Sequence, residues 1–131
     1  MKYILFGGRG FIGTHFSNQL EAQNMDHVIY DIKDPEESQN HLDVRTELNI
    51  TGYSENDVIV NLAAIHKTPG HSEKEYFETN ILGAENVCNF ARRNNINTIL
   101  FTSSIAPYAA SEKLKSEQTL PMPNTPYGVS K

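Results

Sequence analysis

The chain begins with KYILFGGRGFIG (residues 2–13), in which a short apolar run leads into glycines at positions 7, 10 and 13. A segment with helical spacing follows, and a second apolar run, HVIY (27–30), ends at Asp31. A strand, a glycine-rich turn, a helix, a second strand and an acid, all within about thirty residues, are typical of a dinucleotide-binding unit. A glycine-rich turn in some other α/β domain is the alternative interpretation.

Each of the three glycines has its own role in this interpretation. Gly7 permits the tight turn out of the strand. Gly10 lets the backbone approach a pyrophosphate, and Gly13 lets the helix pack closely against the strand. We expect the free amides of the first helical turn, which includes Phe11 and Ile12, to hold the phosphates with help from the helix dipole.

Asp31 lies 18 residues after Gly13. An acid at about this distance accepts hydrogen bonds from the adenosine ribose in dinucleotide-binding units. Asp31 is therefore the predicted ribose ligand.

Further apolar runs alternate with helical segments along the rest of the chain. Buried parallel strands are predicted over 57–64 (DVIVNLAA) and over 98–103 (TILFTS). A short strand is also predicted over 41–44 (HLDV), between the second strand and these two. Helices are expected over 10–23 and, after the capping-box sequence SEKE, over 72–93. The alternation predicts an α/β fold with a doubly wound parallel sheet that is covered by helices on both faces.

Apolar residues at helical spacing predict which faces of these helices are buried. In the first helix they are Phe11, Ile12, Phe16 and Leu20. In the second they are Phe77, Ile81, Ala84, Cys88 and Ala91, with Tyr76, Asn80 and Val87 beside them. A brief helix is also expected over 45–50.

Composition limits the class of protein. The 131 residues carry a formal net charge of −5, and no basic patch stands out, so nucleic acid is not an expected partner. Cys88 is the single cysteine, which excludes an intrachain disulfide. No apolar run is long enough for a signal peptide or a membrane span, and a soluble, cytoplasmic, single-domain protein is expected. His66 and His71 share a loop, but no carboxylate or cysteine completes a ligand set, so no metal site is predicted.

YGVSK (127–131) places a tyrosine and a lysine four residues apart, on one face if the segment is helical. A nearby ammonium favours the phenolate, so it lowers the tyrosine pKa toward a value suited to proton transfer. Thr102, Ser103 and Ser104, at the end of the last predicted strand, are candidates to hold a substrate oxygen. The alternative is a polar helix start without chemistry.

Taken in order, these segments resemble the extended short-chain dehydrogenase/reductases, which include nucleotide-sugar epimerases, dehydratases and reductases. The resemblance covers essentially the whole chain. It is carried by GGRGFIG (7–13), Asp31, Asp43-Val44, NLAA (61–64), Asn80 in TNILGAENV (79–87), FTSSIAPYA (101–109) and YGVSK (127–131).

The resemblance implies a role for each matching residue. Tyr127 would be the acid/base, Lys131 would bind the nicotinamide ribose, and Ser104, with Ser103 as the alternative, would hydrogen-bond the reacting oxygen. The remaining positions concern the cofactor: Asp31 would bind the adenine ribose, Asp43 and Val44 would contact adenine, Ala63 and Ala64 would line the cofactor, and Asn80 would support the backbone of the active site.

The resemblance also implies the chemistry. The expected activity is that of an NAD-dependent nucleotide-sugar epimerase or dehydratase. Arg9 lies in the glycine turn and resembles an arginine that meets the 2′-phosphate in NADP-dependent reductases, which are the alternative. The charge of Asp31 would repel that phosphate, so NAD is preferred. A dinucleotide-binding module without catalysis is a third possibility.

Members of this family are usually more than twice as long as this chain. The fold is therefore expected to be a Rossmann-like sheet that stops after its fifth strand and the start of the next helix. Residues 1–131 would form an incomplete NAD(P)-binding domain without the C-terminal substrate domain, and would be inactive alone. A homodimer through the helix over 72–93 is possible.

Overall fold

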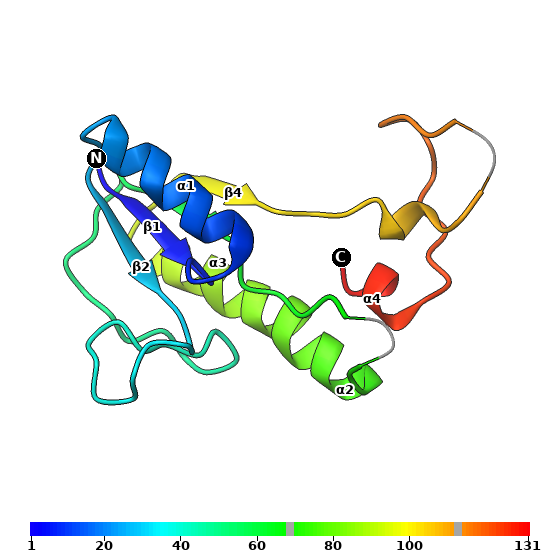
Figure 1. Cartoon of the computed structure of the whole chain (residues 1–131), viewed down its shortest axis with the longest axis horizontal. Coiled ribbons are helices and arrows are strands. Elements are labelled where there is room, and N and C mark those ends of the chain that lie inside the picture. The colour runs from blue at the N-terminus through cyan, green and yellow to red at the C-terminus, as the bar shows by residue number, and fades with distance from the viewer. Residues whose placement is uncertain (68–69, 112–113) are drawn as a thin grey trace.

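The computed structural model describes residues 1–67, 70–111 and 114–131. Within these residues, four parallel strands form one sheet in the order β2-β1-β3-β4 (Figure 1). The strands are β1 (Tyr3–Phe6), β2 (His27–Tyr30), β3 (Val58–Asn61) and β4 (Thr98–Phe101). The register pairs Phe6 with Tyr30 and Asn61, and Asn61 with Phe101, so the four strands end together at one edge.

Helices follow β1 and β3 and cover both faces of the sheet. α1 (Phe11–Ala22) follows β1, and a continuous helical segment of α2 (Glu73–Tyr76), η1 (Phe77–Leu82) and α3 (Gly83–Arg93) follows β3. Two short helices come last, η2 (Ala106–Tyr108) and α4 (Pro126–Val129). Neighbouring strand residues point to opposite faces, and the two buried clusters follow that alternation. Ile4, Phe6 and Ile59 pack with α3, whereas Leu5 and Val60 pack with Leu20 of α1. The predicted doubly wound α/β fold is confirmed. The predicted burial of the strand over 98–103 is wrong, because β4 lies at the edge of the sheet and Leu100 and Phe101 are exposed.

The predicted strand over 41–44 is wrong, and with it the count of five strands. One isolated bridge joins His41 to Asp31 beyond the end of β2. The chain then leaves the sheet because Val44 and Leu48 enter the core that α3 covers. The brief helix expected over 45–50 is also absent from the structure.

The buried face of α1 also differs from the prediction. Its buried residues are Gly13, Ser17 and Leu20, whereas Phe11 is 82% exposed and Ile12 is 59% exposed. Gly13 packs against Gly8 of the glycine turn, and Phe11 lies on the opposite side of the helix at 3.6 residues per turn. The two apolar side chains of the first turn therefore face outward.

The second long helix is rotated relative to the expected face. Phe77 and Ile81, which were predicted in the core, are exposed. The buried positions are Tyr76, Asn80, Gly83, Val87, Phe90 and Ala91. These positions recur every three to four residues across α2, η1 and α3, as the predicted ones did, and Ala91 is buried as predicted. Otherwise the buried face lies one residue earlier along the chain, a rotation of about 100°.

A buried carboxylate holds the start of the sheet together. Asp57 Oδ1 accepts a hydrogen bond from the Lys2 amide at 2.7 Å, and Oδ2 accepts one from the Ser54 amide at 2.8 Å. Burial alone would raise the pKa of Asp57, but these hydrogen bonds outweigh it and hold the pKa below its ordinary value. The ionised carboxylate therefore stabilises the fold.

Asp57→Asn is expected to lower the unfolding free energy by about 1.5–3 kcal/mol at pH 7, because one acceptor becomes a donor that faces an N–H. The contribution of Asp57 is complete above its unfolded pKa of about 3.9, and it is lost as the pH falls through the lower folded pKa. Urea denaturation measures the difference in unfolding free energy between the wild type and Asp57→Asn. This gap should be smaller near pH 3 than at pH 7. A gap of equal size at both pH values would refute this account, and Glu55→Gln in the same turn is the control.

Candidate functional site

The candidate site lies at the edge of the sheet where the strands end. Parallel strands of such sheets present their carboxyl ends to ligands. The segments that leave these ends are the glycine turn after β1, Asp31–Asp34 after β2, Ala63–Lys67 after β3 and Thr102–Tyr108 after β4. Most of the residues predicted from the sequence are in or beside these segments.

The glycine turn is packed too closely for side chains. Gly7 has φ +78°, its amide donates to Tyr30 O at 2.8 Å, and a Cβ there would lie 2.6 Å from Ala63 N. A Cβ on Gly13 would lie 2.4 Å from Gly8 O. The turn therefore contacts the segment after β3, which contains Ala63 and Ala64, on one side and the first turn of α1 on the other.

The N-terminus of α1 has the properties of an anion site. Gly10 is its N-cap, no side chain caps it, and the first turn contains no acid. The helical hydrogen bonds begin with Thr14 N to Gly10 O at 2.9 Å, so the amides of Phe11, Ile12 and Gly13 precede the first of them. These free amides and the positive end of the helix dipole fit the pyrophosphate of a dinucleotide.

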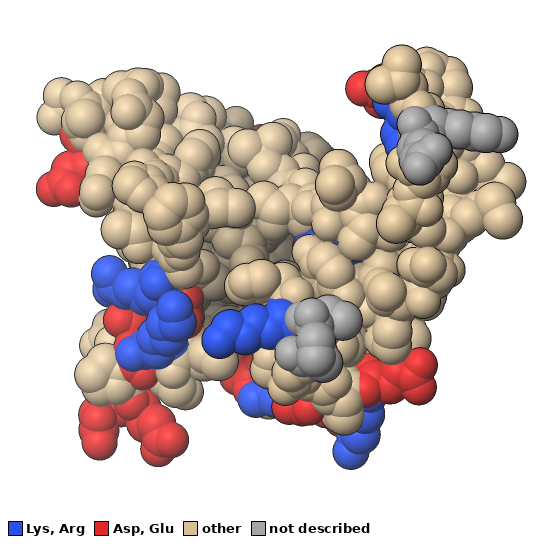
Figure 2. Space-filling view, turned by 45° about the vertical axis from the view of Figure 1, so that its right-hand side comes forward, with Lys and Arg blue, Asp and Glu red and all other residues tan. Residues whose placement is uncertain are grey.

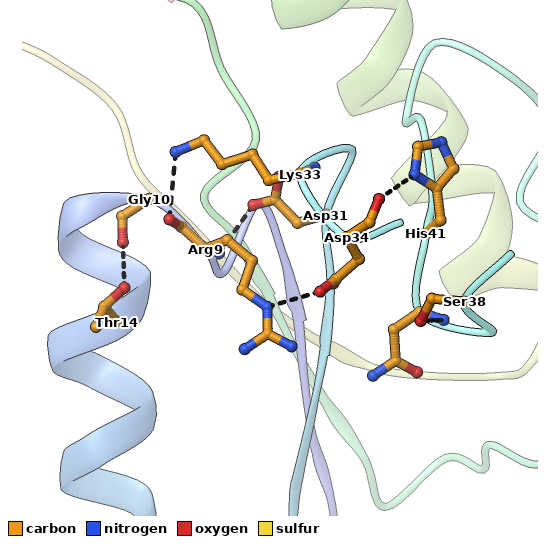
Figure 3. Close-up of polar contacts among 9 residues, drawn as sticks. Arg9, Gly10, Thr14, Asp31, Lys33, Asp34, Ser38 and His41 are labelled. Carbon is orange, nitrogen blue, oxygen red and sulfur yellow. Dashed lines mark hydrogen bonds and ion pairs between the residues drawn. The ribbon is translucent and has the colours of Figure 1, made fainter. Parts of the chain in front are cut away.

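Asp31 holds the glycine turn against β2. Its Oδ2 accepts from the Arg9 amide at 2.8 Å and its Oδ1 accepts from the Lys33 amide at 2.9 Å (Figure 3). The residue is buried. A carboxylate oxygen accepts more than one hydrogen bond, so the carboxylate keeps lone pairs for a ribose hydroxyl. Its role as the ribose ligand stays a prediction.

A second acid, Asp34, completes this end of the site and was not among the predicted residues. Its Oδ1 pairs with Arg9 Nε at 3.0 Å, and its backbone oxygen is 2.7 Å from His41 Nδ1 (Figure 3). Lys33 Nζ donates to the backbone oxygen of Arg9 at 3.3 Å. Nothing in the glycine spacing required a second acid three residues after Asp31, so the sequence carried no signal for it.

Asp43 and Val44 lie in the segment that crosses to α3. Asp43 forms an ion pair with Arg45 at 2.6 Å, and the hydrogen bonds from Arg45 lower the pKa of Asp43. Val44 is a core residue: a Cβ on Gly83 would lie 2.7 Å from its Cγ2, and its backbone oxygen accepts from Asn86 Nδ2 at 2.8 Å. The predicted contacts of Asp43 and Val44 with adenine stay predictions.

Asn80 joins two parts of the site through three hydrogen bonds. From η1 its side chain accepts from Ile65 N at 2.9 Å and donates to Ile65 O at 3.1 Å. Its amide also donates to Ser130 Oγ at 2.8 Å, and that hydroxyl donates to Tyr127 O at 2.8 Å. Asn80 is buried and thus ties the segment after β3 to α4.

α4 carries Tyr127 at the same edge. Thr125 caps this helix by accepting from Gly128 N at 3.0 Å, and a Cβ on Gly128 would lie 2.7 Å from Ala106 O. The Tyr127 ring is half-buried, with its centroid 6.1 Å from that of Tyr76. α4 therefore packs between η2 and α2, with Tyr127 beside α2.

Lys131 contacts the end of β4. Its Nζ donates to Thr102 O at 2.5 Å and lies 4.7 Å from the centroid of the Phe101 ring, and its partial burial lowers its pKa. Ser103 Oγ donates to Lys131 O at 3.4 Å, whereas Ser104 Oγ accepts from Ala106 N at 3.1 Å. The structure thus brings Tyr127, Lys131 and the two serines to one edge, and their catalytic roles stay predictions.

The two histidines that share a loop, His66 and His71, have different surroundings. His71 lies 3.5 Å from Glu75, and His66 is exposed. Among the described residues, no three His, Cys, Asp or Glu side chains are grouped to hold a metal ion.

The space-filling view of one face shows acidic and basic side chains intermixed along its lower part (Figure 2). No described helix is long and apolar enough to cross a bilayer.

Comparisons with known proteins agree with this geometry. Residues 3–131 match the NAD dependent epimerase/dehydratase family. D-erythronate dehydrogenase of Haemophilus influenzae is 31% identical over 147 residues, covering 100% of this chain and 47% of that protein. An N-acetyl-alpha-D-glucosaminyl-diphospho-ditrans,octacis-undecaprenol 4-epimerase of Escherichia coli O157:H7 is 30% identical over 140 residues, covering 98% of this chain and 40% of the relative.

Solved structures share the fold. A UDP-galactose 4-epimerase superposes with a TM-score of 0.84 at 24% identity, covering 100% of this chain and 48% of the other. A UDP-glucose 4-epimerase of Thermus thermophilus in complex with NAD gives 0.78 at 22% identity, covering 100% and 47%. The chain therefore spans about half the length of the relatives it matches.

Proposed function

Because the chain belongs to the NAD-dependent epimerase/dehydratase family, we propose that it is the cofactor-binding part of an NAD-dependent nucleotide-sugar epimerase or dehydratase. The observation that carries the proposal is the uncapped N-terminus of α1 behind the glycine turn, with the buried Asp31 beside it. This combination offers amides to a pyrophosphate and a carboxylate to a ribose.

Each part of the site has a role in this proposal. The amides of Phe11 and Ile12 bind the pyrophosphate, and the absence of a side chain at Gly10 lets it approach. Asp31 accepts from the adenine ribose. The remaining cofactor contacts are those of Asp43, Val44, Ala63 and Ala64. NAD, when bound, supplies a hydride acceptor for the reacting sugar carbon.

The proton chemistry belongs to the other end of the site. Tyr127 takes a proton from a sugar hydroxyl, and Lys131 binds the nicotinamide ribose. Ser104 hydrogen-bonds the reacting oxygen. The hydrogen bonds from Asn80 to Ser130 and Ile65 support this arrangement, because they fix α4 against the segment after β3.

The substrate class and assembly are part of the same proposal. A nucleotide-sugar is favoured because several relatives are UDP-glucose 4-epimerases, such as that of Lactobacillus helveticus, which is 25% identical. The exposed Phe77 and Ile81 of η1 support a homodimer through this helix. A cytoplasmic location stays a prediction.

Tyr127→Phe in the full-length protein is expected to lower turnover of a UDP-sugar by about 10²–10⁴-fold, because the acid/base is lost. NAD affinity should not change. Steady-state kinetics with an NAD titration measures both, and Tyr108→Phe, a half-buried tyrosine in η2, is the control. Unchanged turnover of Tyr127→Phe would show that Tyr127 is not the acid/base, whereas a wild type that binds NAD without turnover, and whose biological role Tyr127→Phe leaves unaffected, would support a dinucleotide-binding module without catalysis.

A further inference from the structure

We propose that Asp34 determines which dinucleotide this site accepts: by holding the Arg9 guanidinium, it keeps that arginine from a 2′-phosphate and selects NAD over NADP. The inference rests on the proposed function, because it concerns the ribose end of the same site. The observation that supports the inference is the ion pair between Arg9, in the glycine turn, and Asp34, which follows β2.

Arg9 lies next to the predicted ligand of the adenine ribose. Its backbone amide donates to the Asp31 carboxylate, which is the predicted ligand of the ribose hydroxyls. An arginine beside that carboxylate is suited to a phosphate on the same ribose, since its guanidinium binds phosphate with two parallel hydrogen bonds. In this structure the Arg9 Nε–H instead donates to Asp34 Oδ1 at 3.0 Å (Figure 3).

The carboxylate of Asp34 depends on Arg9 more than an exposed acid would. The side chain of Asp34 is only 12% exposed, whereas that of Arg9 is 45% exposed. Asp34 Oδ2 is buried and has no hydrogen-bond partner within residues 1–67, 70–111 and 114–131. Exposed ion pairs are weak because water competes with them. Here water has little access to the acid, so Arg9 is its main source of compensation.

The four charges at this end of the site balance. Arg9 and Lys33 are opposed by Asp31 and Asp34, and Lys33 Nζ donates to the backbone oxygen of Arg9. A 2′-phosphate would add up to two negative charges to this neutral group while its natural partner is engaged. NAD carries a hydroxyl at that position and adds no charge there, so the pair does not oppose it.

Isothermal titration of the chain with NAD and with NADP tests the proposal in the wild type, Asp34→Asn, Arg9→Ala and the double variant. Asp34→Asn is nearly isosteric and removes the negative charge that holds the guanidinium. It should raise NADP affinity by about tenfold and change NAD affinity by less than about twofold. The gain should vanish in the double variant, because it requires Arg9. Glu47→Gln, which frees Arg93 from a 2.7 Å ion pair elsewhere, should change neither affinity.

Two results would overturn the inference while leaving the proposed function intact. One is that the wild type binds NAD but Asp34→Asn binds NADP no more tightly than the wild type does. The other is a gain for NADP that persists without Arg9, which would show that only the charge of Asp34 matters. Absence of binding of either dinucleotide to the folded wild type would overturn the proposed function and this inference together. Thermal melts of each variant confirm that it is folded.

Discussion

Gly7→Ala is expected to abolish dinucleotide binding and to lower the unfolding free energy by about 3 kcal/mol or more. Gly7 has φ +78°, and an added Cβ would lie 2.6 Å from the backbone nitrogen of Ala63. The variant therefore combines backbone strain with a clash against main chain that cannot rotate away. Relief requires β1 and β3 to separate at the edge where the site lies. Urea denaturation and an NAD titration measure the two losses.

Gly52→Ala is the matched control for this variant. Gly52 also has a positive φ, +91°, but a Cβ there would meet nothing within 4 Å. It should cost only the left-handed strain, about 1–2 kcal/mol, and leave NAD binding unchanged. Equal losses in the two variants would show that close packing of the glycine turn is not what makes Gly7 necessary.

Asn80→Leu is expected to lower the unfolding free energy by about 3–5 kcal/mol and to loosen α4. The leucine has a similar volume but leaves the amide and carbonyl of Ile65 without their partner, at about 1–3 kcal/mol for each buried group left unpaired. It also removes the hydrogen bond that the Ser130 hydroxyl accepts, although that hydroxyl still donates to Tyr127 O. Hydrogen exchange at the amides of 127–131 should become faster, because Ser130 links Asn80 to the backbone of Tyr127.

Asn86→Leu is the control for Asn80→Leu. It tests whether the loss of any asparagine from this helical segment destabilises the fold and loosens α4 in the same way. Asn86 makes one hydrogen bond, to Val44 O at 2.8 Å, from the same continuous helical segment. Its loss should cost about 1 kcal/mol and leave exchange in α4 unchanged. An Asn80→Leu variant with protected α4 amides would contradict the linking role assigned to Asn80.

The glycine turn, the four strands and Asp31 were predictable because local sequence determines them. Gly7 is required by its positive φ, and Gly13 by its contact with Gly8 in the same β-α unit. Strands of a parallel sheet favour uninterrupted apolar runs. Tyr127 and Lys131 were selected by their four-residue spacing, and the structure places them at the same edge. Their predicted catalytic roles came from the family resemblance, because the spacing alone did not indicate them.

Other features depend on contacts between distant segments. The spacing rule gives the period of a helix but not the direction in which its buried face points, and it placed Phe77 and Ile81 in the core. The buried residues are instead their neighbours one position earlier, Tyr76 and Asn80, and Val87 in place of Cys88. The segment over 41–44 has the composition of a strand, but packing of Val44 against Gly83 draws it off the sheet. The pairing of Arg9 with Asp34 depends on where β2 ends relative to the glycine turn, which the residue spacing does not specify.

The central claim, that the uncapped start of α1 binds the pyrophosphate of NAD, is tested most directly by isothermal titration of Gly10→Ala with NAD beside the wild type. Gly10 has φ −77°, and a Cβ there would approach only Gly7 O, at 3.4 Å, so alanine is compatible with the fold. The methyl group would enter the space through which the pyrophosphate approaches the amides. The account predicts that the wild type binds NAD and that the folded variant loses at least about tenfold in affinity. Equal affinity in the two proteins would contradict it.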